Sequence, residues 1–399
     1  MTSNAISTLQ SETEFELLHN ILPFWMTKMI DHENGGFLGR VDGYGTVDHQ
    51  TGKGCVLNAR ILWTFSSAYR IFKNNVYLET AERAREYLLQ FFEDKKYGGF
   101  YWLLDNKGSR VDTKKQVYAQ AFVIYALAEH YRATQSESSL KKAIELFHII
   151  EKYSYDTKLG GYFEAFTREW GEISDLRLSE KDANEKKTMN THLHILEAYT
   201  NLYRIWKDDQ LKKQLQTLIE LYADRFVNKK SFNLNMFFDE NWNDKTDLIS
   251  YGHNIESSWL LYEAAQVLGN RELIHRTGEL SLKIAHASMD GLRPDGGLIY
   301  EQFFNGHTDT DRHWWVQAES VVGFFNAFEL SENEDFLEKA LASWKFISTH
   351  LIDKNKGEWF WSVNDNREPN RKEDKAGFWK CPYHNSRMCF ELLERKSGK

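Results

Sequence analysis

Apolar residues recur at helical spacing along almost the whole chain, in segments separated by short polar stretches. Each segment repeats apolar positions three and four residues apart, which is the pattern of a helix that buries one face. Twelve such segments follow one another, at 11–29, 59–72, 80–92, 116–131, 139–153, 192–206, 211–226, 255–268, 272–288, 318–330, 335–351 and 385–395. The pattern therefore predicts an all-α protein with about twelve helices.

A second pattern, of glycines followed by aromatic residues, alternates with the helices. Its first glycines are Gly35, Gly98, Gly160, Gly296 and Gly357, so successive copies lie 63, 62, 136 and 61 residues apart. The third interval is about twice the others, and the aromatic stretch 232–243 falls where the missing copy should be. The chain thus predicts six repeats of about 64 residues, each with two helices and a short turn or hairpin of strands.

A closed ring is the most economical way to bury these repeats. One helical hairpin cannot bury its apolar face alone, whereas six hairpins in a ring pack an inner layer of helices against an outer one. The sequence therefore predicts an (α/α)6 barrel that occupies residues 1–399 as a single domain, with short β-hairpins in the loops. An open helical solenoid is the alternative. The presence of only four prolines argues against linkers between domains.

Composition and charge narrow the classes of protein. Aromatic residues make up 15% of the 399 residues, as in a large packed core, and the net charge of −8 argues against a nucleic-acid partner. No apolar run reaches the roughly 18–20 residues that span a bilayer, and residues 1–18 lack the features of a secretory leader. The three cysteines have no paired spacing, which disfavours a disulfide framework or a zinc cluster. We expect a cytoplasmic protein without a membrane partner.

Polar residues concentrate where the inner helices should begin. In a closed ring these helices run parallel, so their N-termini meet at one end of the barrel. The less charged helix of each repeat should be the inner one, and these helices are predicted to begin near Cys55, Gln116, Asn190, His253, Gln317 and Tyr383. The residues at these starts are Asn58, Arg60, Asn190, His192, His194, His253, Glu256, Gln317, Glu319, Trp379 and His384. We expect residues far apart in sequence to line one cavity.

Two of these histidines suit acid–base chemistry. Helix N-termini carry partial positive charge that disfavours imidazolium, so His253 and His384 should remain neutral bases near neutral pH. Bases on opposite walls can move a proton to and from either face of one carbon, and Arg60 can stabilise the oxyanion that forms. Tryptophan faces suited to sugar rings are offered by Trp314, Trp315, Trp359, Trp361 and Trp379.

Some of these residues also fit purely structural roles. His192 and His194 are two residues apart and point to different sides of a helix, so at most one faces the cavity. The register with Glu197 favours His194. Glu256 lies three residues after His253, and it is either part of the chemistry or a hydrogen-bond partner that holds this histidine.

The sequence gives no sign of a metal or nucleotide cofactor. His253 and Glu256 could ligate a cation, but there is no HExxH motif, no paired cysteine set and no carboxylate cluster beside His253. The Gly-Gly pairs precede aromatic residues rather than helix starts, unlike a phosphate-binding loop. We therefore predict an enzyme that uses no cofactor.

A resemblance to a known family runs over essentially the whole chain. It is carried by ILPFW, GCVLNARILW, KTMNTHLHILEAYTNLYR, SYGHNIESSWLL, WWVQAESVVGFFNA and WKCPYHNSRMC. These motifs resemble the cellobiose 2-epimerases of the N-acylglucosamine 2-epimerase superfamily. The resemblance implies an (α/α)6 barrel without a cofactor that converts the reducing-end glucose of β-1,4-linked disaccharides, such as cellobiose or lactose, to mannose.

The resemblance also implies roles for individual residues. His253 and His384 would form the acid–base pair at C2, while His194 and Glu256 would support ring opening and orient the pair. The implied substrate-binding residues are Arg60, Asn190, Glu319, Trp314 or Trp315, and Trp379, with Arg60 and Asn190 on the C1 and C2 oxygens of a cis-enediolate. Asn254 stands where close relatives are expected to have Asp, and we expect it to point away from the His253 face.

Other functions remain open on the sequence alone. Inverting glycoside hydrolases share this barrel, and Glu256 and Glu319 could be their two carboxylates. A non-catalytic module that binds a sugar or a protein is a second alternative. Within the resemblance, free mannose or glucose could replace the disaccharide as the substrate of an epimerase or an aldose–ketose isomerase. We expect a small sugar as the partner and either a monomer or a homodimer.

Overall fold

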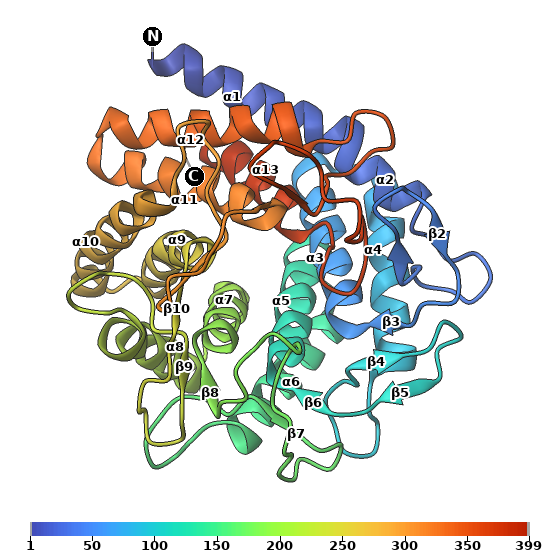
Figure 1. Ribbon diagram of the computed structural model, residues 1–399. Helices are drawn as coiled ribbons and strands as arrows, with labels where there is room; N and C mark the ends of the chain where they lie inside the picture. The colour runs from blue at the N-terminus through green and yellow to red at the C-terminus, as the bar shows by residue number, and fades with distance from the viewer. Residues whose placement is uncertain (1, 397–399) are drawn as a thin grey trace.

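The protein forms a closed ring of helices around a central axis (Figure 1). The computed structural model describes residues 2–396, with only the backbone of Lys396. Within this range six inner helices surround the axis: α3 (Cys55–Phe72), α5 (Val117–Thr134), α7 (Met189–Ile205), α9 (Tyr251–Leu268), α11 (Trp314–Ser331) and α13 (Tyr383–Lys396). Each packs against the next, and α13 packs against α3. This closure excludes an open solenoid, and the predicted (α/α)6 barrel is confirmed.

The outer layer contains the second helix of each hairpin. Its first member is continuous through α1 (Thr2–Glu16), the π-helical turn η1 (Leu17–Ile21) and α2 (Leu22–Thr27). The others are α4 (Asn75–Tyr87), α6 (Glu137–Tyr153), α8 (Asp209–Leu221), α10 (Arg271–Ser288) and α12 (Glu334–Phe346). Short turns extend four of them: η2 (Leu88–Phe92), η3 (Tyr222–Phe226), η4 (Met289–Gly291) and η5 (Ile347–Leu351).

Hydrophobic patterning explains which helices lie inside. The outer helix α8 buries only one stripe, formed by Leu211, Leu215, Leu218 and Ile219. The inner helix α9 buries residues on nearly every side, polar ones included, because it has neighbours all around. None of the helices described is both long and apolar enough to cross a lipid bilayer.

Short strands collect at the mouth of the barrel, where the inner helices begin. The antiparallel pairs are β1 (Arg40–Val41) with β2 (Val47–Asp48), β6 (Lys115–Gln116) with β7 (Ala165–Phe166), β8 (Lys187–Thr188) with β9 (Phe237–Phe238), and β13 (Arg312–His313) with β14 (Ser362–Val363). Two three-stranded sheets join β3 (Lys53–Gly54), β4 (Leu103–Leu104) and β5 (Arg110–Asp112), and β10 (Leu248–Ser250), β11 (Glu301–Phe303) and β12 (Thr308–Asp309). Five of these strands lead directly into an inner helix.

Six equivalent β-bridges close the turns that follow the outer helices, and they confirm the six repeats. They pair Ile30 with Phe37, Glu93 with Phe100, Tyr155 with Tyr162, Val227 with Leu234, Leu292 with Leu298, and Ile352 with Trp359. The fourth bridge lies at the copy that lacks glycines, where Phe232 adopts a φ of 58°. The other turns use glycine for this left-handed conformation, which side chains make unfavourable.

A polar side chain in the first turns of an inner helix ties that helix to one of these turns. Gln120, His192, Asn254 and Gln317 accept hydrogen bonds from the backbone N–H groups of Phe100, Tyr162, Leu234 and Leu298, respectively. His192 is therefore one of a structural series. Asn254 also points away from the cavity, as the sequence predicted.

Candidate active site

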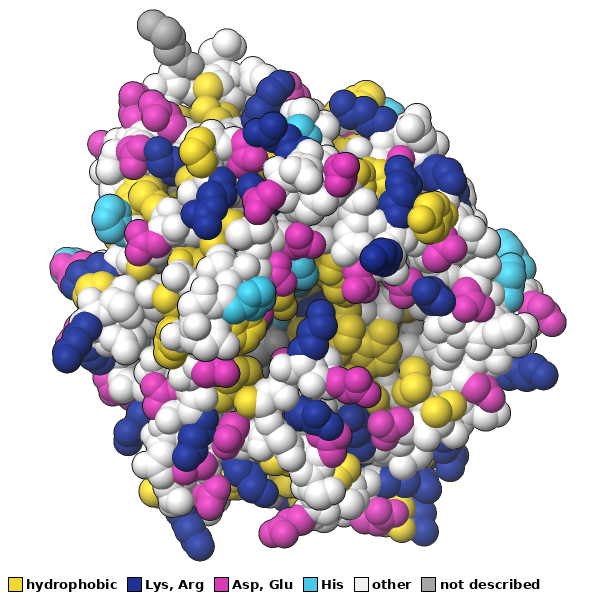
Figure 2. All heavy atoms as spheres, viewed as in Figure 1, with side chains coloured by type: hydrophobic (Ala, Val, Ile, Leu, Met, Phe, Trp, Pro, Cys, Tyr) yellow, Lys and Arg dark blue, Asp and Glu magenta, His cyan; other side chains and the backbone are white. Residues whose placement is uncertain are grey.

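One large cavity opens at the end of the barrel where the inner helices begin. Its volume is about 790 Å³, within the usual range for small-molecule sites. The space-filling view shows this end hollowed near its centre (Figure 2). Nine of the ten predicted site residues line the cavity: Arg60, Asn190, His194, His253, Glu256, Trp314, Trp315, Trp379 and His384. The tenth, Glu319, is buried behind His384.

His253 projects into the cavity from the first turn of α9. The helix begins at Tyr251 rather than at His253. It follows β10 directly, and the last residue of that strand, Ser250, is its N-cap. The Ser250 hydroxyl lies 2.7 Å from Nδ1 of His253. Burial in the cavity wall lowers the pKa of His253 to about 3, so its imidazole is neutral at neutral pH.

His384 faces the same space from the first turn of α13. Its Nδ1 lies 2.7 Å from Oε1 of Glu319 and 3.9 Å from Oε1 of Glu256. Burial, followed by the charges of Arg60 and Arg387, holds the pKa of His384 well below its usual value. His384 is therefore also a neutral base, with a carboxylate behind it.

Trp315 connects the two histidines. Its indole lies 4.8 Å from the His253 ring and 5.6 Å from the His384 ring, measured between centroids. Gly252 makes this possible, because a Cβ at that position would lie 2.5 Å from the Trp315 ring. Trp314 instead packs against Trp361. Of the two tryptophans, Trp315 is therefore the one that contacts both histidines.

His194 forms a third imidazole of the site, on α7. Its Nδ1 lies 3.0 Å from Oε2 of Glu197, and its ring packs edge-on against Tyr118, 4.9 Å away. Burial lowers the pKa of His194 to about 4. Burial opposes ionisation of Glu197, but the charge of Arg387 and the contacts with His194 and Tyr383 together outweigh it and bring the pKa of this carboxyl down to about 2.

Arg387 joins the carboxylates beneath the histidines. Its Nη2 donates to Oε1 of Glu256 at 2.6 Å and to Oε1 of Glu319 at 2.5 Å, and its Nη1 contacts Glu197. Burial, together with the neighbouring Glu319, raises the pKa of Glu256 to about 8. Glu256, Glu319 and His384 have the composition of a metal site, but Arg387 already donates hydrogen bonds to both carboxyl groups.

Arg60 and Asn190 offer unpaired polar groups to a ligand. Arg60 donates to the Tyr118 hydroxyl at 2.8 Å and lies over the ring of Phe122, yet it pairs with no carboxylate in the described part of the chain. Its Nε and the Asn190 side-chain oxygen are buried without hydrogen-bond partners. Buried groups of this kind are costly unless a ligand satisfies them.

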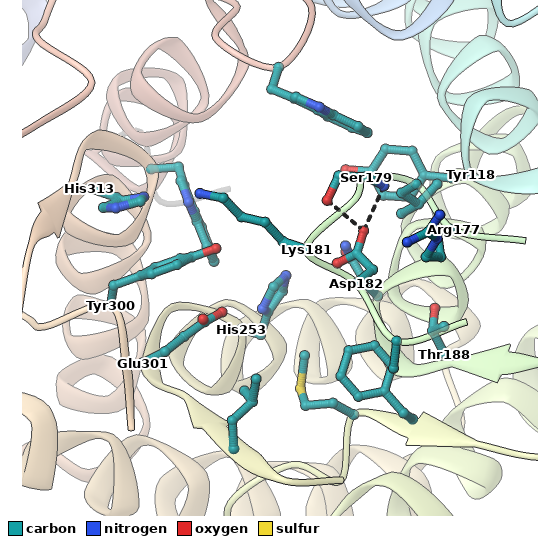
Figure 3. Close-up of a pocket in the computed structure, with 18 of the residues that line it drawn as sticks. Tyr118, Arg177, Ser179, Lys181, Asp182, Thr188, His253, Tyr300, Glu301 and His313 are labelled. Carbon is teal, nitrogen blue, oxygen red and sulfur yellow. Dashed lines mark hydrogen bonds between the residues drawn. The ribbon is translucent and has the colours of Figure 1, made fainter. Parts of the chain in front are cut away.

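The rim of the cavity is formed by loops outside the helical ring. Residues 176–183 reach over the opening, where Ser179 donates to Asp182 through its N–H and its hydroxyl (Figure 3). Opposite this loop, Tyr300 stacks on His313 with centroids 3.9 Å apart, and Glu301 lies beside them. The rim thus adds polar and aromatic groups above the histidines.

Comparison with known proteins identifies the family. Residues 36–387 match the family model described as N-acylglucosamine 2-epimerase (GlcNAc 2-epimerase). The chain belongs to this epimerase family. It is 53% identical to the cellobiose 2-epimerase of Bacteroides fragilis over 386 residues, covering 96% of this chain and 98% of that one.

Solved structures agree with this placement. The cellobiose 2-epimerase of Bacillus thermoamylovorans superposes with a TM-score of 0.94 at 44% identity, covering 98% of this chain and 100% of that one. A GH76 α-mannanase of Bacteroides thetaiotaomicron shares the fold alone. Its TM-score is 0.66 at 13% identity, covering 99% of this chain and 97% of that one.

Sequence reasoning about this epimerase missed Arg387 and Glu197 as site residues. The signal was present in the spacing, because each of three inner helices carries a histidine followed three residues later by a charged residue. These pairs are His194 with Glu197, His253 with Glu256, and His384 with Arg387. Only the structure shows that Glu197 and Glu256 meet on the Arg387 guanidinium, together with Glu319.

Proposed function

We propose that the protein is a cellobiose 2-epimerase, which inverts C2 of the reducing-end glucose of β-1,4-linked disaccharides such as cellobiose and lactose through a cis-enediolate. The observation that carries the proposal is the placement of His253 and His384 against one indole, that of Trp315, in one cavity. The 53% identity to the Bacteroides fragilis enzyme supports the same reaction.

Ring opening comes first, because the hydrogen on C2 becomes acidic only when C1 is an aldehyde. We assign this proton transfer between sugar oxygens to His384, with His194 and Glu256 in support. The imidazoles of His194 and His384 are neutral because burial lowers the pKa of each, so either can accept a proton at neutral pH.

Epimerisation at C2 needs two bases with the sugar held between them. One histidine of the pair His253 and His384 removes the C2 proton and becomes imidazolium. The C2–C3 bond of the enediolate then rotates. The other histidine takes up a proton from solvent and delivers it to the opposite face, and the first histidine releases its proton to solvent. A positioned acid or base of this kind contributes roughly 10² to 10⁴ in rate.

The enediolate carries negative charge that the site must stabilise. Arg60 has a positive charge without a carboxylate partner among the described residues, and the side-chain oxygen of Asn190 has no hydrogen-bond partner there. We assign both to the oxygens on C1 and C2: the Arg60 charge stabilises the negative oxygen in the transition state, and the Asn190 oxygen accepts a hydrogen bond from the hydroxyl group. Trp315 and Trp379 stack on the sugar, and the second sugar extends toward Tyr300 and Glu301 at the rim.

The carboxylates argue against glycoside hydrolysis. Glu256 and Glu319 accept hydrogen bonds from the same nitrogen of Arg387, and their oxygens lie within 4.8 Å of each other. An inverting hydrolase needs its two carboxyl groups roughly 6.5–9.5 Å apart, on opposite sides of the scissile bond. These two lie together on one side of the cavity, beside His384.

Product analysis tests the proposed substrate. Cellobiose, lactose, mannose and N-acetylglucosamine are incubated separately with the protein, and products are separated by chromatography. We expect glucosyl-mannose from cellobiose and epilactose from lactose, with slow formation of the ketose when the proton returns to C1. Turnover of mannose with no change in either disaccharide would contradict the proposal, and free glucose from cellobiose would favour a hydrolase.

A further inference from the structure

A continuous chain of hydrogen-bonding groups joins two of the three imidazoles of the site. His194 meets Glu197 through Nδ1, and His384 meets Glu319 through Nδ1. Arg387 binds both carboxylates, Glu197 through Nη1 and Glu319 through Nη2. All five side chains are at least nine-tenths buried. The groups come from α7, α11 and α13, and Arg387 joins the carboxyl group on α7 to the one on α11.

The direction of these hydrogen bonds depends on the charge of the carboxylates. An ionised carboxylate only accepts hydrogen bonds, so the Nδ1 atom that contacts it must carry the hydrogen. The Nε2 atom of the same neutral ring is then bare and can take a proton. A protonated carboxyl group can instead donate to Nδ1, which leaves the hydrogen on Nε2 and removes the base.

Ionised carboxylates at this depth need a cation. Burial disfavours the charged form of both groups: it raises the pKa of Glu319, while the pKa of Glu197 is lowered on balance, and Arg387 is the cation that contacts both. The other supports are neutral: the Tyr383 hydroxyl contacts Glu197, and the Trp259 indole N–H donates to Glu319 at 3.0 Å. Arg387 is thus placed to decide whether both carboxylates are charged.

We propose that Arg387 is a positioning residue for proton transfer to and from the sugar: it keeps Glu197 and Glu319 ionised, and thereby holds His194 and His384 in the tautomer with a bare Nε2. This inference rests on the proposed function, because it concerns the bases of that reaction. His253 is independent of Arg387, since a serine hydroxyl, which can donate or accept, contacts its Nδ1.

The pH dependence follows from the groups around His384. They are Arg60 on α3, His194 and Glu197 on α7, Glu256 on α9, Glu319 on α11 and Arg387 on α13. Without the guanidinium, Glu319 binds a proton more tightly. Activity that needs the ionised form then appears only at higher pH, so the acid limb of the kcat profile moves upward.

The proposal is tested with the variants Arg387→Met and Arg387→Lys, and Arg395→Met serves as the matched control. Arg395 also lies on α13 and pairs with Glu329 and Glu391, away from the cavity. With cellobiose we expect a fall in kcat of at least about 100-fold for Arg387→Met, a smaller change in KM and an acid limb at higher pH. Arg387→Lys should restore part of kcat and move the limb back. Arg395→Met should keep the wild-type profile.

Two results would overturn the inference: a wild-type acid limb for Arg387→Met, or a loss of kcat that Arg387→Lys does not reduce. If Arg387→Met does not fold, ¹⁵N-histidine NMR of the wild-type protein decides. We expect hydrogen on Nδ1 and none on Nε2 of both His194 and His384. The signals are assigned with single histidine variants. The reverse tautomer would refute the inference. A wild-type protein that leaves cellobiose unchanged would count against the proposed function instead.

Discussion

The His384 imidazole is hydrogen-bonded to Glu319, with 2.7 Å between Nδ1 and Oε1. Glu319 was expected from the resemblance to bind substrate, but it lies behind the histidine and is 1% exposed. Its second oxygen accepts from the Trp259 indole at 3.0 Å. The arrangement leaves the other edge of the His384 ring for the sugar and makes Glu319 a support for the base.

Substitution of either histidine that acts on C2 of the sugar should abolish the reaction while leaving the fold intact. We expect His253→Asn and His384→Asn each to lower kcat by roughly 10² to 10⁴, since each removes one acid–base group. Circular dichroism should show unchanged helical content, because neither ring belongs to the packed core. Near-normal turnover in either variant would contradict the two-base assignment.

The two neighbouring tryptophans should respond differently to substitution. Trp315→Ala removes the surface that contacts both His253 and His384, so KM for cellobiose should rise several-fold, in line with about 0.5–1.5 kcal/mol for an aromatic contact. Trp314 packs against Trp361, and Trp314→Phe should leave KM within about twofold. A larger KM effect for Trp314→Phe than for Trp315→Ala would reverse the assignment.

Glu164 should make the protein less stable as pH rises. This buried carboxyl accepts hydrogen bonds from the Thr188 N–H and the Thr191 hydroxyl, and burial raises its pKa to about 8. Because the folded state binds the proton more tightly than the unfolded state, the stabilisation is complete below about pH 4.5 and is lost as pH rises toward 8.

Glu164→Gln mimics the protonated form and tests this sign. Denaturant unfolding should show the variant to be more stable than wild type at pH 8.5, by roughly 2–4 kcal/mol, and nearly equal at pH 5. Equal stability at both pH values would mean that the carboxyl has an ordinary pKa in the folded protein.

Asn254 should matter for stability and little for chemistry. Its side-chain oxygen accepts from the Leu234 N–H at 2.9 Å, and its amide donates to Asn233 at 2.7 Å. Asn254→Ala leaves that buried N–H without a partner and should lower the free energy of unfolding by about 1–3 kcal/mol. Steady-state kinetics at 25 °C should give a kcat within twofold of wild type, and a large loss would place Asn254 in the site.

Periodicity alone was sufficient for the fold. The intervals between Gly35, Gly98 and Gly160 gave the repeat length, and the gap before Gly296 located a sixth copy that lacks glycine. The structure places the fourth β-bridge there, between Val227 and Leu234. Helix starts were less accurate for α9 and α11, which begin at Tyr251 and Trp314 rather than near His253 and Gln317.

The residues of the site were only partly within reach of the sequence. Histidines at helix starts could be placed because parallel inner helices bring those starts together. The position of Glu319 behind His384, and the meeting of Glu197 and Glu256 on Arg387, depend on side-chain directions across three helix interfaces. A single sequence shows the spacing of residues along each helix, but it does not show how one helix is rotated relative to its neighbour.

The most direct test is NMR of cellobiose with the wild-type protein in D₂O and EDTA. The account predicts glucosyl-mannose with deuterium at C2, because the proton that returns comes from a histidine that exchanges with solvent. Glucosyl-mannose with protium retained at C2, or cellobiose recovered unchanged, would contradict it.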